Sequence, residues 1–178
     1  MKFYNLKDIF ENKNFINQLL KILTENFPEW IKNENDAMTE LEKSLSDEKI
    51  SIILEDKNTV IGWISGINSY SGAFELHPIV ISKKFQGKGY GKILISYFEK
   101  KVKELGYCTI YLGCDDEDYR TNISGKEIFP DPIDYLINIK NINNHPYEFY
   151  IKCGFSLCGI IPHANGFGKP DILMAKKI

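Results

Sequence analysis

The chain has 178 residues and a formal net charge of −2, with 43% hydrophobic and 26% charged residues. This length suits one domain with a real core, and the composition is that of an ordinary soluble globular protein. The near-neutral charge argues against a broad nucleic-acid surface, which normally carries a basic excess. No run is apolar enough to span a membrane, and MKFYNLKDIF lacks the apolar core of a signal peptide. We therefore expect a single domain, residues 1–178, in the cytoplasm, without nucleic-acid or membrane partners.

Two amphipathic helices are expected first. Residues 14–27 and 35–46 carry apolar side chains at the three- and four-residue spacing of a helix. The FPEW segment between them contains Pro28 and an exposed-looking Trp30, so we expect a loop there.

The pattern then changes to that of β-strands. Residues 51–55 and 59–67 are rich in β-branched side chains, and the turn Asp56-Lys57-Asn58 between them predicts a hairpin. Residues 74–82 are expected to form a third strand, with Pro78 inside it. Because proline donates no hydrogen bond to a neighbouring strand, this strand must bulge or lose its partner there.

Helices and strands alternate in the second half. Helical spacing of apolar residues follows the glycines of residues 83–92 and stops at Gly106, and residues 108–114 are expected to form a strand. Residues 115–145 are long and irregular apart from a short helix near 133–137, and a loop of this length is often functional. The last expected elements are a helix and two strands, at residues 146–153, 155–163 and 171–177. This order predicts a mixed α/β sheet that is antiparallel early, with a helix crossing after the third strand.

The cysteines are few, lie in apolar surroundings and show no CxxC spacing. We expect all four to be reduced, small core residues, namely Cys108, Cys114, Cys153 and Cys158. No group of His and Cys has the spacing of zinc ligands, so no metal is expected.

Residues 83–92, KKFQGKGYGK, place three glycines between a strand and a helix. Glycines packed this way usually hold the backbone close to an anion, often a phosphate. A Walker P-loop is excluded, because Ile93 follows Gly91-Lys92 and Gln86 stands where the first glycine is needed. A Rossmann fingerprint fits poorly, because the spacing is GxGxG, the preceding strand is at least the third, and no acidic ribose partner is well placed.

The stretch from Gln86 to Gly91 instead has the form Q/R-x-x-G-x-G/A, which resembles the coenzyme A loop of the GCN5-related N-acetyltransferase (GNAT) superfamily. The segments FELHPIVIS, IYLGCDDED, NNHPYEFYIKCGF and IIPHANGFGKPDILMAKK resemble the aminoglycoside 6′-N-acetyltransferases, in particular their dimeric chromosomal subgroup. The resemblance covers most of residues 50–178, and FPEW resembles that subgroup's Trp-Pro-acidic loop.

The resemblance implies a GNAT fold, in which a mixed, mostly antiparallel sheet is flanked by helices and its central strands are splayed. It also implies acetyl-coenzyme A as co-substrate and a homodimer. The implied cofactor contacts lie on one strand, the glycine loop and one tyrosine: Ile79, Val80, Ile81, Gln86, Gly87, Lys88, Gly89, Tyr90, Gly91, Lys92 and Tyr150.

Acetyl transfer to an amine needs a neutral amine, a polarised thioester carbonyl and a proton for the departing thiolate. The resemblance places the Ile79 N–H near the thioester oxygen, while the side chains of Ile79 and Ile81 are expected in the core. Glu75 matches the position that binds the substrate amine. It could accept the amine's proton, directly or through water, or only orient the amine, because an ordinary glutamate is a weak base.

Tyr150, the second tyrosine of YEFY, is placed by the resemblance near the coenzyme A sulfur. A phenol there can give a proton to the thiolate or hydrogen-bond to it. Tyr147 is the rival for this role, and aromatic packing is the alternative for both.

Acidic residues follow the strand that ends at Cys114, and an acidic wall suits a polycationic sugar. A plain solvated loop is the alternative. The candidate substrate-binding residues are Glu29, Trp30, Glu75, His77, Asp115, Asp118 and Asp171. His77 could be a proton relay, but a strand histidine beside a proline more often has a structural role. For Asp171, a substrate role and a structural role both stay open.

Three functions remain in competition. The first is acetyl transfer to the 6′-amine of an aminoglycoside, and hence antibiotic resistance. The second is acetyl transfer to another amine, such as a polyamine or a protein or peptide amine, because the acidic residues suit these as well. The third is a non-catalytic module that binds acetyl-coenzyme A, against which Glu75 and Tyr150 both count.

Overall fold

The computed structural model describes residues 1–178, which form two compact units. The first unit contains Met1–Cys108 together with Ile178, and the second contains Thr109–Lys177. None of the helices is both long and apolar enough to cross a membrane. That the whole chain acts as one domain stays a prediction.

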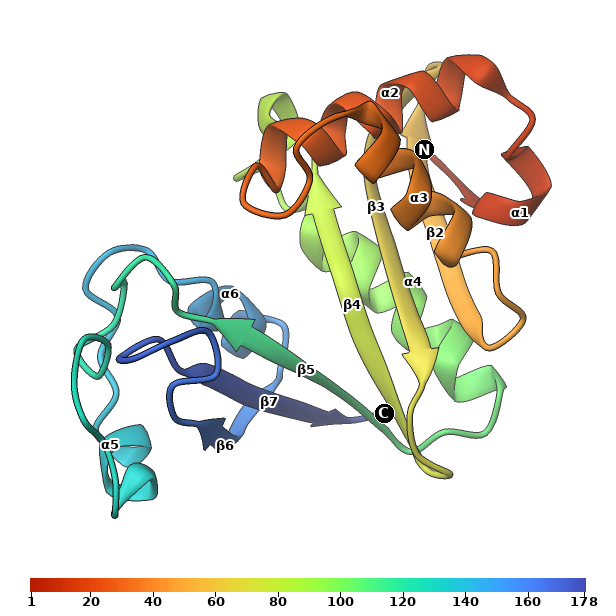
Figure 1. Cartoon of the computed structure of the whole chain (residues 1–178). Helices are drawn as coiled ribbons and strands as arrows, with labels where there is room; N and C mark the ends of the chain where they lie inside the picture. Colours follow the sequence, from red (N-terminus) through yellow and green to blue (C-terminus); the bar gives the residue numbers. More distant parts are fainter. The chain divides into compact units, whose positions relative to one another are not determined.

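The first unit is a four-stranded antiparallel sheet with helices on both faces (Figure 1). Its strands lie in the order β1-β2-β3-β4. In chain order its elements are β1 (Lys2–Asn5), α1 (Leu6–Ile9), α2 (Lys13–Asn26), α3 (Glu34–Lys43), β2 (Lys49–Asp56), β3 (Thr59–Asn68), β4 (Ala73–Ile81), the 3-10 helix η1 (Lys83–Phe85) and α4 (Tyr90–Glu104).

The start of the chain differs from the sequence-based expectation, which placed only helices before the first hairpin. β1 precedes those helices and pairs with β2, from Lys2 opposite Glu55 to Asn5 opposite Ile52. Four residues are too few to show a strand's alternation, so this strand depends on its partner and on packing. The Phe3 ring stacks on Tyr97 of α4, with ring centroids 3.9 Å apart.

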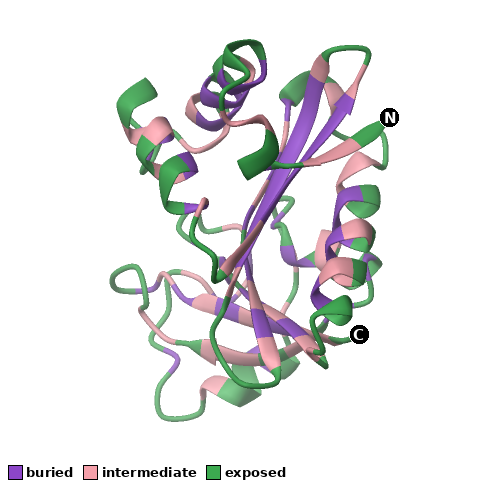
Figure 2. Cartoon of the chain, turned by 90° about the vertical axis from the view of Figure 1, so that its right-hand side faces the viewer, coloured by how far each residue is buried: buried purple, intermediate pink, exposed green.

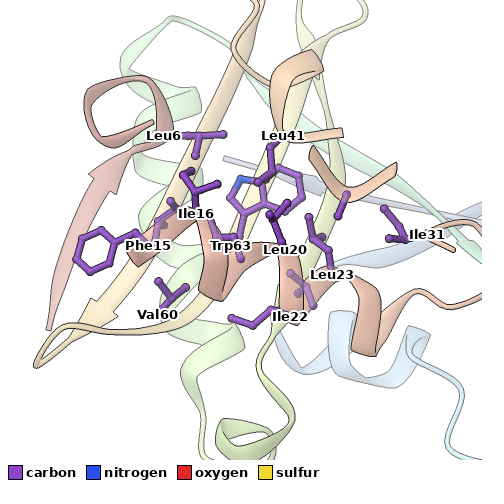
Figure 3. Close-up of a cluster of buried hydrophobic side chains, with 14 residues drawn as sticks. Leu6, Phe15, Ile16, Leu20, Ile22, Leu23, Ile31, Leu41, Val60 and Trp63 are labelled. Atoms are coloured by element: carbon purple, nitrogen blue, oxygen red, sulfur yellow. The ribbon is translucent and has the colours of Figure 1, made fainter. Parts of the chain in front are cut away.

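Two apolar layers hold this sheet between its helices. On one face, side chains from α1, α2 and α3 pack around Trp63 and Val60 of β3 (Figure 3). On the other face, α4 buries Leu94 and Phe98, and the Phe98 ring lies edge-on to Phe74 of β4. β3 is therefore buried along most of its length (Figure 2).

The pairing of β3 with β4 is irregular at Pro78, as predicted. Ile64 lies opposite Ile79, whereas Gly66 lies opposite Leu76, so the register shifts between these two pairs. A side chain at Gly66 would clash with both the Glu75 carbonyl and the Phe98 ring. Glycine at this position lets β4 and α4 approach the strand closely beside Glu75.

The second unit contains three strands and two short helices. Its elements are β5 (Thr109–Asp115), α5 (Pro132–Ile137), α6 (Tyr147–Lys152), β6 (Ser156–Ile161) and β7 (Asp171–Lys177). β7 pairs antiparallel with β5 on one side and with β6 on the other. The mixed α/β class, with mostly antiparallel strands and flanking helices, is confirmed.

None of the four cysteines forms a disulfide bond. Cys114 and Cys153 are buried, as expected. The expectation of a core position is wrong for Cys108 and Cys158, which are exposed. Cys108 lies in the connection just before β5, and Cys158 lies on β6, whose side chains are at most half-buried.

Two facing serines in the first sheet give a stability prediction. Ser51 and Ser65 are opposite each other on β2 and β3, and both are buried. The Ser51 hydroxyl accepts a hydrogen bond of 2.8 Å from Trp63 Nε1, whereas the Ser65 hydroxyl has no partner. Ser51→Ala should lower the free energy of unfolding by about 1–3 kcal/mol, because the buried indole N–H loses its acceptor. Ser65→Ala should leave it unchanged or raise it, because an unsatisfied hydroxyl is removed.

Urea denaturation followed by tryptophan fluorescence measures the free energy of unfolding of both variants. Each variant removes one serine hydroxyl, from facing positions in the sheet, so each serves as the control for the other. If both variants lost the same stability, the hydrogen bond from Trp63 to Ser51 would not contribute specifically to stability.

Candidate functional site

The glycine loop, Gln86–Lys92, joins η1 to the start of α4. Gly87 and Gly89 have φ angles of +71° and +86°, which L side chains rarely adopt. A Cβ at either position would meet no other atom within 4 Å. Glycine is therefore needed at these two positions for backbone conformation, and the main chain there is accessible.

The loop leaves the N-terminus of α4 without a cap. Gly89 is the N-cap residue, so no side chain can accept a hydrogen bond there, and the first turn contains no acidic residue. The first helical bond runs from the Ile93 N–H to the Gly89 carbonyl. The N–H groups of Tyr90, Gly91 and Lys92 thus have no acceptor within the helix. Together with the helix dipole and the exposed Lys88 and Lys92 side chains, they are arranged as would suit an anion.

Hydrogen bonds within the protein fix the loop in this shape. The Gln86 amide nitrogen donates to Asn26 Oδ1 at the end of α2 and to the Ile81 carbonyl at the end of β4, both at 2.9 Å. Lys88 Nζ donates to the Lys84 carbonyl at 2.8 Å. Gln86 therefore positions the loop, and its amide nitrogen is already engaged with protein acceptors.

β4 carries Glu75 before the irregularity at Pro78 and Ile79 after it. The Glu75 side chain is half-buried and accepts a hydrogen bond of 3.0 Å from the Ser69 hydroxyl. Ile79, Val80 and Ile81 follow on the same strand and are predicted to serve the cofactor. Of these three side chains, only that of Val80 is buried. The expectation of core side chains is wrong for Ile79 and Ile81, which are half-buried.

The loop between α2 and α3 reaches β4 through aromatic contacts. The Trp30 side chain is 41% exposed, and its ring centroid lies 5.0 Å from Phe27 and 6.3 Å from His77. His77 and the neighbouring Glu29 are also exposed. Within the first unit, Trp30 and His77 thus form a small aromatic surface on the strand that carries Glu75.

In the second unit, Asp115 at the end of β5 lies directly opposite Asp171 at the start of β7. The Asn165 side chain donates a hydrogen bond of 2.5 Å to the Asp115 carboxylate. A side chain at Gly113 would clash with the Asp171 carboxylate, so glycine makes room for that group. Two carboxylates predicted to bind substrate are therefore brought together by strand pairing.

The acidic residues after Asp115 differ from one another in environment. The Asp116 side chain is fully buried and accepts hydrogen bonds from the Arg120 N–H (2.7 Å), the Thr121 N–H and hydroxyl (2.9 and 2.6 Å), and the Ser124 hydroxyl. Burial acts to raise the pKa of Asp116, but these hydrogen bonds outweigh it and hold the pKa below its usual value. By contrast, Asp118 is exposed and forms an ion pair of 2.6 Å with Arg120. Asp116 therefore organises the loop, whereas Asp118 faces solvent.

The two candidate tyrosines on α6 are in different surroundings. Tyr150 is half-buried between Phe149 and Phe155, with ring centroids 5.2 and 5.7 Å away. Burial, with a smaller contribution from the thiols of Cys114 and Cys153, raises the pKa of Tyr150, so its hydroxyl keeps its proton at neutral pH. Tyr147 is 5% exposed and packs against the His145 ring. Both tyrosines therefore take part in aromatic packing.

Two structural residues beside the candidate site were not identified from the sequence, namely Asp116 and His145. His145 is 2% exposed and contacts both Asp115 and Tyr147. The sequence did contain a signal for Asp116. Thr121 and Ser124 follow it within one loop, and their hydroxyl groups are typical donors of hydrogen bonds to a nearby carboxylate. The histidine in HPYEFY gave no such signal, since its partner Asp115 lies thirty residues earlier.

Residues 16–122 match the model of the acetyltransferase (GNAT) family. The chain belongs to the GNAT family. Three solved structures are similar over 99% of this chain and 97% of each of theirs. An aminoglycoside 6′-N-acetyltransferase complexed with coenzyme A is 34% identical, with a TM-score of 0.91. The enzyme from Enterococcus faecium is 34% identical with a TM-score of 0.89, and the type Ii enzyme is 31% identical with a TM-score of 0.76.

These comparisons confirm the resemblance found in the sequence, and the protein is a GNAT acetyltransferase. No group of His, Cys, Asp and Glu side chains gathers in a way that could hold a metal ion. The role of each candidate site residue stays a prediction.

The pKa of Asp116 gives a prediction about pH. Because its folded-state pKa is lowered, the ionised carboxylate stabilises the fold at pH values above about 4, the unfolded value, and this stabilisation is lost as pH falls through the folded pKa. Asp116→Asn should therefore lower the free energy of unfolding at pH 7 by about 1–3 kcal/mol, because an amide cannot accept all of these hydrogen bonds. The difference from the unsubstituted protein should shrink as pH falls below about 4.

Urea denaturation between pH 7 and pH 3 measures this difference. Asp118→Asn is the matched control, because its exposed carboxylate forms only a surface ion pair. A difference for Asp116→Asn that stays constant across this range would show that the carboxylate charge is not what holds the loop.

Proposed function

We propose that the protein transfers the acetyl group of acetyl-coenzyme A to the 6′-amine of aminoglycoside antibiotics, and so confers resistance to them. The observation that carries this proposal is the similarity at 31–34% identity, over nearly the whole chain, to three aminoglycoside 6′-N-acetyltransferases. The acidic side chains at the ends of β5 and β7 support it, because aminoglycosides are polycations.

The glycine loop suits coenzyme A. Its pyrophosphate is an anion that the free N–H groups of Tyr90, Gly91 and Lys92 could bind, with Lys88 and Lys92 adding attraction. The coenzyme supplies the acetyl group as a reactive thioester. The main-chain groups of Ile79–Ile81 are proposed to bind the adjoining part of the coenzyme, with the Ile79 N–H polarising the thioester carbonyl.

The amine is proposed to bind at Glu75. The Ser69 hydroxyl holds one carboxylate oxygen of Glu75, and a carboxylate fixed in this way can orient an ammonium group and accept its proton directly or through water. Glu29, Trp30 and His77 are proposed to contact the rest of the sugar, since aromatic faces and acids both attract cations.

Tyr150 is proposed to donate a proton to the departing thiolate. Its raised pKa keeps the hydroxyl protonated at neutral pH, so it carries a hydrogen that it can donate to the thiolate or share with it in a hydrogen bond. Asp115, Asp118 and Asp171 are proposed to bind the other ammonium groups of the substrate. Strand pairing and the Asn165 side chain both hold Asp115 in place.

The resemblance to the dimeric subgroup of these enzymes supports a homodimer in the cytoplasm. Size-exclusion chromatography with light scattering would measure the mass in solution.

A substrate panel tests the function. Purified protein with acetyl-coenzyme A should release free thiol with kanamycin or tobramycin faster than with polyamines or with peptides that have a free N-terminus. Glu75→Ala combined with Tyr150→Phe should lower kcat/KM by about 10²–10⁴-fold, because proton transfers at both reacting groups are lost.

Turnover of polyamines or peptides without aminoglycosides would favour the second function, acetylation of another amine. Binding of acetyl-coenzyme A without any turnover would favour the non-catalytic module instead.

The proposed role of the α4 N-terminus is tested by a charge reversal. Lys92→Glu places a carboxylate in the first turn, which favours the helix but repels an anion bound there. The KM for acetyl-coenzyme A should rise about tenfold or more while thermal stability is unchanged or higher. Lys100→Glu, on the same helix, is the control, because it makes the same change in net charge away from the first turn. An equal rise in KM for both variants would indicate general electrostatics rather than this site.

A further inference from the structure

His145 occupies a position that the proposed function leaves unexplained. It lies two residues before Tyr147, at the entrance to α6, and its side chain is buried. Burial lowers the pKa of its imidazole, although the Asp115 carbonyl and the Asp116 carboxylate act to raise it. A buried imidazole must satisfy both of its ring nitrogens, and in this case both find main-chain partners.

The two partners determine which nitrogen carries the proton. The Tyr147 N–H donates to His145 Nδ1 at 3.2 Å, so Nδ1 must be unprotonated. His145 Nε2 therefore carries the hydrogen and donates it to the Asp115 carbonyl at 3.0 Å. One neutral ring thus links the last residue of β5 to the first residue of α6.

The main chain of His145 is itself fixed. The Asn141 side chain accepts a hydrogen bond from the His145 N–H at 2.8 Å and donates one to its carbonyl at 2.9 Å. Asn141 also pairs with Thr121 in an isolated β-bridge, and Thr121 donates to the buried Asp116 carboxylate. The imidazole therefore belongs to a continuous network that runs from the acidic loop to α6.

We propose that His145 is a positioning residue that sets Asp115, at the end of β5, and Tyr150, on α6, in the arrangement that acetyl transfer requires. This inference rests on the proposed function, because it concerns the residues proposed there to bind the acceptor and to protonate the thiolate. Its two hydrogen bonds act separately: the one from Nε2 holds Asp115, and the one to Nδ1 holds the start of the helix that carries Tyr150.

Two amide substitutions separate these effects. In His145→Asn, the side-chain oxygen can still accept from the Tyr147 N–H, but the side chain is too short to reach the Asp115 carbonyl. In His145→Gln, the longer amide can still donate to the Asp115 carbonyl, but the acceptor for the Tyr147 N–H is lost. Each variant thus keeps one of the two hydrogen bonds.

Steady-state kinetics on the full-length protein should distinguish the variants. His145→Asn should raise the KM for the acceptor about tenfold with kcat within about twofold of the unsubstituted protein. His145→Gln should lower kcat about tenfold with KM within about twofold, because Tyr150 is displaced. Leu136→Ala, which shortens a buried side chain on α5, controls for loss of stability and should change neither parameter to this extent.

Amide hydrogen exchange measured by NMR gives a second readout that needs no turnover. The Tyr147 N–H should be protected in the unsubstituted protein and in His145→Asn, and should exchange faster in His145→Gln. The proposal is overturned if both variants change the same kinetic parameter, or if the Tyr147 N–H stays protected in His145→Gln. If the unsubstituted protein acetylates no aminoglycoside, the proposed function fails, and the kinetics are measured with whichever acceptor the panel identifies. If it acetylates nothing, the role in acetyl transfer fails with it, and exchange reports only the two hydrogen bonds.

Discussion

Pro78 has no N–H to give to β3, and the pairing of β4 with β3 is interrupted there. The ladder is regular from Phe74 to Leu76 and again from Ile79 to Ile81, with a shift in register between them. The main-chain groups between Leu76 and Ile79 are therefore released from pairing with β3. Glu75, proposed to bind the amine, lies on one side of the interruption, and the residues proposed to serve coenzyme A lie on the other.

The same principle, backbone groups left without partners, applies where the chain continues into α4. A helix of 15 residues normally has a side-chain cap or an acid in its first turn, and this helix has neither. Gln86 holds the preceding loop to α2 and β4, so the free N–H groups are presented in a fixed place. The N-terminus of α4 therefore lacks the stabilisation that a cap or an acidic side chain would give, and a bound anion would supply it.

The sequence predicted most of this architecture, because its signals are local. Helical spacing in α2 and α4, β-branched runs in β2 and β3, and the proline in β4 each depend on neighbouring residues. β1 was missed because a four-residue strand exists only through its partner. Asp116 and His145 were missed because burial depends on contacts between distant segments, and an acid in a row of four acids is indistinguishable from its neighbours until the fold buries one of them.

Asp115 and Asp171 bring two carboxylates together in the second unit. Like charges directly opposite each other on antiparallel strands destabilise a sheet. Glycine at position 113 makes room for one carboxylate, Asn165 holds the other, and His145 fixes the main chain beside it. We propose that these two carboxylates attract a cationic acceptor through their charge. Attraction of this kind favours positive charge in general and not one particular amine.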